Sequence, residues 1–279
     1  MIKKCNKNDE NLINYYIKDC YYKSLYLYLN YDKYKFSNSN INTYIQLDGN
    51  DNIICLLLNF GSTLHILSRD NNALIPELCD FINSNNFSVI CTNDFIANSI
   101  YNNYEPGIFD ISIGKIFELK EINKELVVDK NINVVKATEN DYLDIVDLLM
   151  SDEEKKKVYS RDSLYNQLYQ RNMEKYGRNY IIKDNNNVVA HAGTGAENSL
   201  IAVINSVIVD KNYRRRGLAT VAVKKLCEDL LSERKICYLM VLDNEAEQLY
   251  KKIGFCEKST YGKLIRRWIN CLIIFLYLI

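Results

Sequence analysis

The sequence predicts an α/β fold of two similarly built domains, in each of which helices flank a mixed, mostly antiparallel sheet. The chain has 279 residues, about twice the size of a common domain. Apolar runs of strand length alternate with runs of helical periodicity. The succession of these elements in the second half recurs in the first half from its hairpin onward, which favours a duplicated architecture.

The second domain is expected at 132–279, after a polar linker at 120–131. Leu200 to Val209 is almost continuously apolar, which indicates a central strand buried on both faces. Gly254 is expected to end the last helix. The predicted elements are a strand at 132–137, helices at 138–149 and 161–176, strands at 179–183, 188–194 and 200–209, a helix at 218–232, a strand at 236–242, a helix at 244–253 and a strand from Phe255 onward.

The first domain is expected at 1–125, with a turn at 68–73 that contains no glycine. The predicted elements are a helical opening at 9–30, strands at 43–48, 52–60 and 63–68, a helix at 72–84, a strand at 87–92, a helix at 94–103 and a strand at 108–119.

Composition excludes several function classes. Lys+Arg and Asp+Glu are both 35, so no charge excess recruits nucleic acid or an anionic membrane. The nine cysteines form no C-x-x-C pair, the chain has two histidines, and its first residues contain no secretory signal. We therefore expect free thiols, no metal site and a cytoplasmic location.

The C-terminal segment Cys271 to Ile279 is nine consecutive apolar residues. A spanning helix needs about 20, so no stable membrane span is expected. A buried final strand is the preferred interpretation. A membrane-surface tail and a C-terminus foreign to the natural protein are the alternatives.

The turn between the predicted strand at 200–209 and the helix at 218–232 is the sharpest chemical feature. Its sequence is Arg214-Arg215-Arg216-Gly217-Leu218-Ala219-Thr220. The first amides of a helix have no intrahelical acceptor, and the helix dipole adds positive potential there. Together with guanidinium groups this pattern predicts a pyrophosphate site. The alternative is that the arginines only solvate a loop; the nucleotide-binding patterns G-x-x-x-x-G-K-[ST] and G-x-G-x-x-G are absent.

The segment Asn244 to Phe255 is the second feature, with Tyr250 on a short predicted helix. Taken together with the arginine-glycine turn, it resembles the GNAT superfamily of acyl-CoA-dependent N-acyltransferases. The run from His191 to Glu197, leading into Ile201 to Val209, resembles the branch related to glycine N-acyltransferases. That branch carries a degenerate, similarly folded domain ahead of the active one, so the resemblance implies tandem GNAT-like domains.

The resemblance also implies the roles of individual residues. Arg214, Arg215, Arg216, Gly217, Leu218, Ala219 and Thr220 would hold the pyrophosphate of acetyl-CoA. The backbone of Val207, Ile208 and Val209 would pair with its pantetheine arm, and an N–H there would stabilise the thioester oxyanion. Asn244 would contact the pantetheine, and Tyr250 would act as general acid.

The general base is where the sequence departs from the family pattern. Many relatives carry a carboxylate at the position that is Val203 here. Glu197 is the nearest candidate base in the sequence, and its alternative is an exposed loop carboxylate. His191 with a water chain is a further alternative, although its apolar neighbours favour a packed strand residue.

The resemblance therefore predicts a cytoplasmic N-acetyltransferase that moves an acetyl group from acetyl-CoA to a primary amine by direct attack. The acceptor would be a small-molecule amine or a peptide N-terminus, with no nucleic acid and no metal, in a monomer or homodimer. The alternatives are a non-catalytic acyl-CoA-binding or interaction module and a membrane-proximal enzyme that uses the tail from Trp268.

Overall fold

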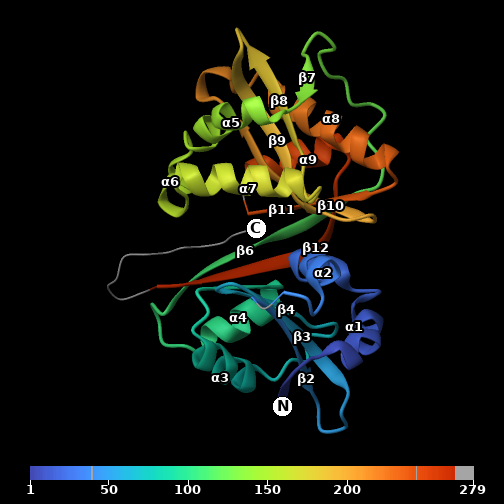
Figure 1. The fold of residues 1–279 in the computed structure, drawn as a ribbon, viewed down its shortest axis with the longest axis vertical. Coiled ribbons are helices and arrows are strands. Elements are labelled where there is room, and N and C mark those ends of the chain that lie inside the picture. The colour runs from blue at the N-terminus through green and yellow to red at the C-terminus, as the bar shows by residue number, and fades with distance from the viewer. Residues whose placement is uncertain (39, 243, 268–279) are drawn as a thin grey trace. The chain divides into compact units, whose positions relative to one another are not determined.

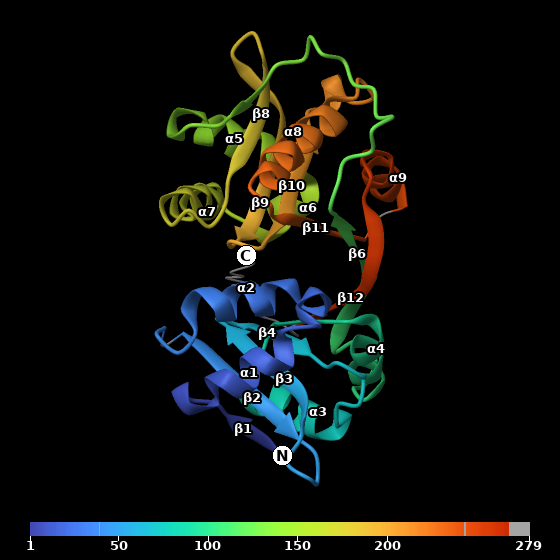
Figure 2. The same ribbon diagram turned by 90° about the vertical axis from the view of Figure 1, so that its right-hand side faces the viewer.

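The computed structural model describes residues 1–38, 40–242 and 244–267. The chain divides into two compact units (Figures 1 and 2). Unit 1 contains residues 1–116 and the described residues from Lys258 onward, and unit 2 contains Phe117–Glu257.

The sheet of unit 2 has the strand order β6-β11-β10-β9-β8-β7. β10 and β11 are parallel, whereas β10–β9, β9–β8 and β8–β7 are antiparallel. The strands are the end of β6 (Phe109–Leu119), β7 (Val134–Lys136), β8 (Asn179–Asp184), β9 (Asn187–Glu197), β10 (Ile201–Val209) and β11 (Ile236–Val241). The helices are α5 (Tyr142–Leu149), α6 (Glu153–Val158), α7 (Arg161–Met173), α8 (Leu218–Ser232) and α9 (Asn244–Ile253).

Helices cover both faces of this sheet (Figure 2). Tyr180 and Ile182 of β8 pack in a core with α8, whereas Ile181 packs in a second core with α5 and α7. Successive strand residues point to opposite faces, so β8 is buried from both sides. The apolar character of the central strands follows from this arrangement.

The sheet of unit 1 has the strand order β1-β2-β3-β4-β5-β12-β6, and only β4–β5 is parallel among the pairs described. Its strands are β1 (Ile2–Lys4), β2 (Ile41–Leu47), β3 (Ile53–Phe60), β4 (Thr63–Leu67), β5 (Val89–Thr92), the first part of β6 and most of β12 (Cys256–Arg266). The helices are α1 (Glu10–Ile17), α2 (Leu25–Tyr34), α3 (Ile75–Asn85) and α4 (Asp94–Asn102).

Several elements differ from the prediction. The helical opening expected at 9–30 is wrong as a single helix, because it is two helices separated by a 3-10 turn at Tyr21–Lys23. β1 and α6 were not expected. β12 lies in the range predicted for the second domain, yet its residues from Lys258 belong to unit 1, because Gly262 to Ile265 pair with β5.

The predicted class is confirmed: each unit is a mixed, mostly antiparallel sheet flanked by helices. The described residues include no helix long and apolar enough to cross a membrane. Within them, eight cysteines are free thiols, and all except Cys256 are buried. The segment from Cys271 to Ile279, for which a buried strand was expected, lies outside the described residues.

Candidate active site

The two parallel strands of unit 2 separate halfway along β10. Their pairing begins at Ile201 and Ile236 and ends at Ile204 and Leu239. β10 continues to Val209, and none of the described residues of β11 pairs with its last five residues. The second half of β10 therefore has a backbone edge that is open toward β11.

A β-bulge lies at the point of separation. Asn205 is opposite Gly193 of β9 and Ile208 is opposite His191, so three steps on β10 match two on β9. Such a mismatch inserts one extra residue into the strand. Ser206, inside the bulge, has a φ of +56°, in the left-handed region.

The bulge reverses which side chains face α8. Before it, Ala202 and Ile204 pack in the core that α8 covers. After it, the odd-numbered Val207 and Val209 pack against that core, while Ile208 packs with α5 and α7. An insertion of one residue has this effect because the side-chain period of a strand is two.

β10 leads into α8 through a turn with two left-handed residues. A 3-10 turn at Lys211–Tyr213 is followed by Arg214, by Arg215 at φ +61° and by Gly217 at φ +77°. Gly217 is the N-cap of α8 and has no side chain to cap the helix. A glycine suits this position because a left-handed backbone costs it little.

The first amides of α8 are free to bind a ligand. Val221 donates to the Gly217 carbonyl, which is the first backbone bond of the helix. The backbone N–H groups of Leu218, Ala219 and Thr220 have no acceptor among the residues that the structure describes. Free backbone donors at the positive end of a helix dipole are an arrangement that favours anions.

The three arginines of the turn are exposed, as expected for a binding loop. Arg216 Nη2 donates to the Asn212 carbonyl at 3.0 Å, and its guanidinium lies 4.8 Å from the centre of the Tyr213 ring. Arg214 Nε donates to the Val209 carbonyl at 3.3 Å. Arg214 and Arg216 thus each use one guanidinium nitrogen to bind a carbonyl of the turn. Their other N–H groups could donate to an anion.

Tyr250 lies on α9, half-buried against the same core as Val207, Val209 and Leu218. Its ring packs edge-to-face on Phe255, with 5.8 Å between centroids. Its hydroxyl has no hydrogen-bond partner among the described residues. Burial, reinforced by the nearby Cys227, raises the pKa of Tyr250 to about 12. The phenol therefore stays protonated and can donate a hydrogen bond.

Asn244, the predicted pantetheine contact, begins α9. Its side chain lies outside the part of the chain that the structure describes.

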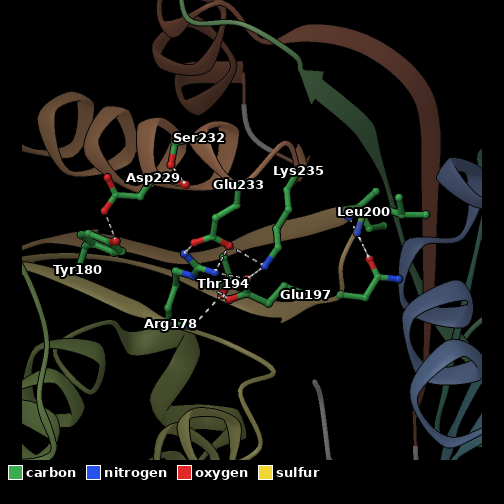
Figure 3. A network of polar contacts seen from close by, with 11 residues as sticks. Arg178, Tyr180, Thr194, Glu197, Leu200, Asp229, Ser232, Glu233 and Lys235 are labelled. Carbon is green, nitrogen blue, oxygen red and sulfur yellow. Dashed lines mark hydrogen bonds and ion pairs between the residues drawn. The ribbon is translucent and has the colours of Figure 1, made fainter.

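Glu197, the predicted base, lies in a buried ionic network at the end of β9 (Figure 3). Its Oε2 lies 2.7 Å from Arg178 Nη2 and 2.6 Å from Lys235 Nζ, and its Oε1 accepts from Thr194 Oγ1 at 3.1 Å. Arg178 also pairs with Glu233 at 2.6 Å.

This network makes Glu197 a poor proton acceptor. Burial alone would raise its pKa, but the hydrogen bonds and charges of Arg178 and Lys235 outweigh burial and lower it. Glu197 pairs with Ala202, five residues before Val207, about 15 Å away along the strand. The geometry favours a structural role for Glu197.

Val203, where many relatives of the resembled family carry a carboxylate, is fully buried and pairs with Ala196 and Tyr238. His191 is also buried, and burial lowers its pKa to about 4. Among the described residues, no group of three or more His, Cys, Asp or Glu side chains could hold a metal ion.

Unit 1 has a turn at the same place in its element order, between β4 and α3. β4 and β5 are parallel, and their pairing ends at His65 and Cys91. Arg69 of this turn is bound inside unit 1, because its Nε donates to the Tyr16 carbonyl at 2.8 Å and its Nη2 to the Tyr15 carbonyl at 2.6 Å. These bonds leave less of the guanidinium for a ligand.

The start of α3 also offers fewer backbone donors than the start of α8. The backbone N–H of Leu74 donates to Gln46 Oε1 at 3.0 Å, and Pro76 has no N–H. Glu77 places a carboxylate in the first turn, where it offsets the positive end of the helix dipole. The turn of unit 1 is therefore less suited to an anion than the turn of unit 2.

Known proteins share the arrangement in unit 2. Residues 142–255 match the acetyltransferase (GNAT) family. This part of unit 2 therefore resembles the GNAT acetyltransferase family. Glucosamine 6-phosphate N-acetyltransferase of Trypanosoma brucei brucei is 41% identical to this chain over 54 residues, which are 19% of this chain and 35% of that protein. The match thus covers little more than a third of that relative's length.

Two solved structures resemble the whole chain in fold. A GNAT-family acetyltransferase from Colwellia psychrerythraea has a TM-score of 0.61 at 12% identity, covering 96% of this chain and all of that one. A tandem GNAT protein from the clavulanic acid biosynthesis pathway has a TM-score of 0.56 at 11% identity, covering 95% and 97%. The predicted tandem GNAT-like fold is consistent with both.

Sequence patterns did not predict the residues that shape unit 2 around the bulge. A serine does not by itself indicate the left-handed backbone that Ser206 adopts. Asn205-Ser206 is, however, the one polar break in the apolar run at 200–209. That break was the only signal available. Arg178 and Lys235 were not singled out, because they meet Glu197 only after folding.

Proposed function

We propose that unit 2 is a GNAT N-acetyltransferase domain, which transfers the acetyl group of acetyl-CoA directly to a primary amine. The observation that carries this proposal is the separation of β10 from β11 directly before the free amides of α8. An open strand edge offers amide partners to a pantetheine arm, and a helix N-terminus offers donors to a pyrophosphate.

The residues of the turn fit the coenzyme. Leu218, Ala219 and Thr220 would bind the pyrophosphate with their backbone N–H groups, and Arg214 to Arg216 would add charge. The backbone of Val207 to Val209 would bind the pantetheine amides, and Asn244 would contact the same arm. The coenzyme supplies an acetyl thioester, whose carbonyl carbon is the electrophile.

In the reaction, the amine nitrogen forms a bond to the acetyl carbon and the carbon–sulfur bond breaks. The amine loses one proton to water and the departing sulfur gains one, so the products are an acetamide and the free thiol. A backbone N–H in the bulge region would stabilise the negative charge that develops on the thioester oxygen. Donors aimed at such charge contribute roughly 3–4 kcal/mol to a barrier.

Tyr250 would stabilise the departing thiolate. Its pKa of about 12 lies above that of a thiol, near 8.5. Full proton transfer from the phenol is therefore uphill by about 5 kcal/mol. A hydrogen bond from the Tyr250 hydroxyl that strengthens as the sulfur gains charge is the role that this pKa permits.

We assign the removal of the amine proton to water. Val203 cannot accept a proton, Glu197 is already bound by two cations, and burial lowers the pKa of His191 to about 4. The acceptor class is a small-molecule amine or a peptide N-terminus. Glucosamine 6-phosphate should be among the first amines tested as acceptors, because a glucosamine 6-phosphate N-acetyltransferase matches part of the chain.

We further propose that unit 1 is the degenerate domain of a glycine N-acyltransferase-like arrangement. Its turn between β4 and α3 binds its own Arg69 internally and carries Pro76 and Glu77 at the helix start. A reducing, cytoplasmic location and a monomer or homodimer without nucleic acid stay part of this proposal.

Thermal unfolding in acetyl-CoA tests the proposal. A ligand at 100 times its Kd stabilises the folded state by about 2.7 kcal/mol, so 1 mM acetyl-CoA should raise the Tm by several degrees. The double variant Arg216→Glu with Gly217→Asp should lose this shift and keep its fold. An unchanged Tm of the wild-type protein in acetyl-CoA would refute coenzyme binding.

One observation favours a second function, a non-catalytic acyl-CoA-binding module: Val203 stands where many relatives of the resembled family carry a carboxylate, and Glu197, the predicted replacement, is held by Arg178 and Lys235. Thiol release from acetyl-CoA distinguishes the two functions. The transferase releases free thiol with at least one amine of a broad panel, including amino acids, polyamines, amino sugars and peptides. The binding module shows the Tm shift without release for any of them.

A further inference from the structure

His191 lies beside the bulge that separates the two halves of β10. Its Nδ1 is 2.7 Å from the Ser206 carbonyl oxygen, and its Nε2 is 2.9 Å from Asn179 Oδ1. All three groups lie within unit 2, on β9, β10 and β8. A chain of polar contacts thus crosses three neighbouring strands at the bulge.

The contact to Ser206 fixes the tautomer of the ring. A carbonyl oxygen only accepts, so Nδ1 carries a proton and donates it. Burial lowers the pKa of His191 to about 4, so the ring is neutral near pH 7 and Nε2 is an acceptor. When the Asn179 amide group is turned by 180°, its N–H₂ group donates to Nε2. Both ring nitrogens of the buried His191 then have a hydrogen-bond partner.

Gly193, two residues after His191, leaves space for the contact between His191 and Asn179. A Cβ atom at Gly193 would lie 2.8 Å from Asn179 Oδ1 and 3.1 Å from His191 Cε1. Any other residue at Gly193 would push the amide or the ring from its place. The glycine is therefore required by the side chains that it faces.

The bulge itself needs such support. Ser206 adopts a left-handed φ of +56°, which costs a non-glycine residue of order 1 kcal/mol or more. Of the described residues, none in β9 or β11 is the register partner of Ser206 or Val207. Without His191 the carbonyl of the half-buried Ser206 would lose this hydrogen bond, and that loss would favour a regular strand.

Loss of the bulge would displace the proposed coenzyme-binding backbone. In a regular strand, residues 207 and 209 would face away from α8, because the alternation that starts at Ala202 and Ile204 would continue unbroken. We infer that His191 is a positioning residue for acyl transfer: its imidazole stabilises the Ser206 carbonyl, and thereby the bulge that orients Val207 to Val209 toward the thioester. This inference rests on the proposed function.

The test compares two substitutions that differ in one donor. His191→Asn places an amide N–H near the position of Nδ1, whereas His191→Leu removes the donor. The control for lost packing on the same strand is Val188→Ala, because Val188 is buried but lies outside the polar chain. Where His191→Leu does not fold, His191→Gln serves, because its longer side chain places the amide near Nε2 instead.

The readout is acetyl-CoA labelled with carbon-13 at the carbonyl, together with the Kd values of acetyl-CoA and free CoA. On binding to the wild-type protein and to His191→Asn, the carbonyl resonance should move downfield, as it does for a hydrogen-bonded carbonyl. His191→Leu, or His191→Gln, should lose most of that movement, with the Kd of free CoA changed less than about threefold. Turnover should fall about 10²-fold, the size of a lost oxyanion donor.

The outcomes separate the two proposals. Wild-type protein that binds neither acetyl-CoA nor CoA overturns the proposed function and this inference with it. Wild-type protein that binds, with the same carbonyl resonance and turnover in His191→Leu or His191→Gln, overturns the role of His191 alone. A loss in Val188→Ala equal to that in the His191 variants would also overturn it, because packing would then explain the effect.

Discussion

Ile204 of β10 and Leu239 of β11 are the last register pair that the described residues form between these parallel strands. The position of this pair decides where an open edge begins. Had the pairing continued in the same register, Asn205 and Ser206 would be opposite Met240 and Val241, the last two residues of β11. The bulge at Ser206, directly after the pair, accounts for the separation, because it bends the strand away from its neighbour.

Gly217 supplies the first prediction. Its φ is +77°, yet a Cβ atom there would meet no other atom within 4 Å. Gly217→Ala should therefore cost only backbone strain, about 1 kcal/mol in the free energy of unfolding, and Gly217→Asn less. Urea denaturation measures this. Gly177→Ala is the contrasting variant, since its Cβ would lie 2.8 Å from the Thr194 carbonyl oxygen, and it should cost more than Gly217→Ala.

Local sequence patterns predicted the turn at Gly217 and the helix that follows it. The left-handed N-cap and the strand–turn–helix order are encoded within a few neighbouring residues, so the expected helix at 218–232 is observed without change. The break in the helix expected at 9–30 was missed. The residues from 9 to 30 include no glycine or proline that would indicate the 3-10 turn at Tyr21–Lys23.

Contacts between residues far apart in sequence could not be predicted in the same way. Glu197 was a reasonable base from its place before a central strand, but Arg178 and Lys235 reach it from β8 and β11 only in the folded unit. The bulge depends in the same way on His191, fifteen residues before Ser206. Periodicity does not reveal such partners, because they are set by register across strands.

Tyr250→Phe tests the role of the phenol. We expect kcat to fall about 10²-fold, the size of a lost hydrogen bond to a charge that develops in the transition state, while the Kd of acetyl-CoA changes less than about twofold. The Tyr250 hydroxyl has no partner among the described residues, so its removal should leave the Tm unchanged or slightly higher. Turnover equal to that of the wild-type protein would exclude Tyr250 from the mechanism.

Glu197→Gln tests the ionic network of unit 2. Loss of the carboxylate leaves Arg178 and Lys235 buried with Glu233 alone, so the free energy of unfolding should fall by about 3 kcal/mol. Glu153→Gln is the control, because Glu153 is exposed and forms a surface ion pair with Lys156, and it should cost less than about 0.5 kcal/mol. If Glu197 were instead the general base, Glu197→Gln would lower kcat strongly and leave the free energy of unfolding nearly unchanged.

The same network predicts how stability depends on pH. Bonds to Arg178, opposed by burial and aided by Lys235, lower the pKa of Glu233 from its ordinary 4.5 to about 2. A lowered carboxyl pKa stabilises the fold above the unfolded value, and this stability is lost as pH falls through the folded value. Although burial opposes them, Arg178 and Lys235 also lower the pKa of Glu197, and Glu197→Gln loses this contribution while it keeps that of Glu233. Below pH 4.5, wild-type protein should therefore lose stability more steeply than Glu197→Gln, as measured by urea midpoints. Parallel curves would contradict this account.

The contrast between the two turns predicts one coenzyme site per chain. Arg69→Ala should destabilise unit 1, because it removes bonds to the Tyr15 and Tyr16 carbonyls, but it should leave the Kd of acetyl-CoA unchanged. Titration calorimetry gives the stoichiometry and the Kd together. Two sites per chain, or a Kd weakened by Arg69→Ala, would show that unit 1 binds coenzyme after all.

The dependence of rate on pH tests the assignment of proton removal to water. With no enzymic base titrating near neutrality, kcat/KM should rise about tenfold per pH unit toward the pKa of the acceptor amine, near 10 for an alkylamine. The Tyr250 phenol, with a pKa of about 12, stays protonated over that range, so the rise should not be cut short by its ionisation. Amines of lower pKa should reach their plateau at correspondingly lower pH, since their own deprotonation sets the curve. A plateau of kcat/KM at the same pH for all amines would instead show that a group of the protein acts as the base. Loss of that plateau in Glu197→Gln, or in a His191 variant, would identify the residue.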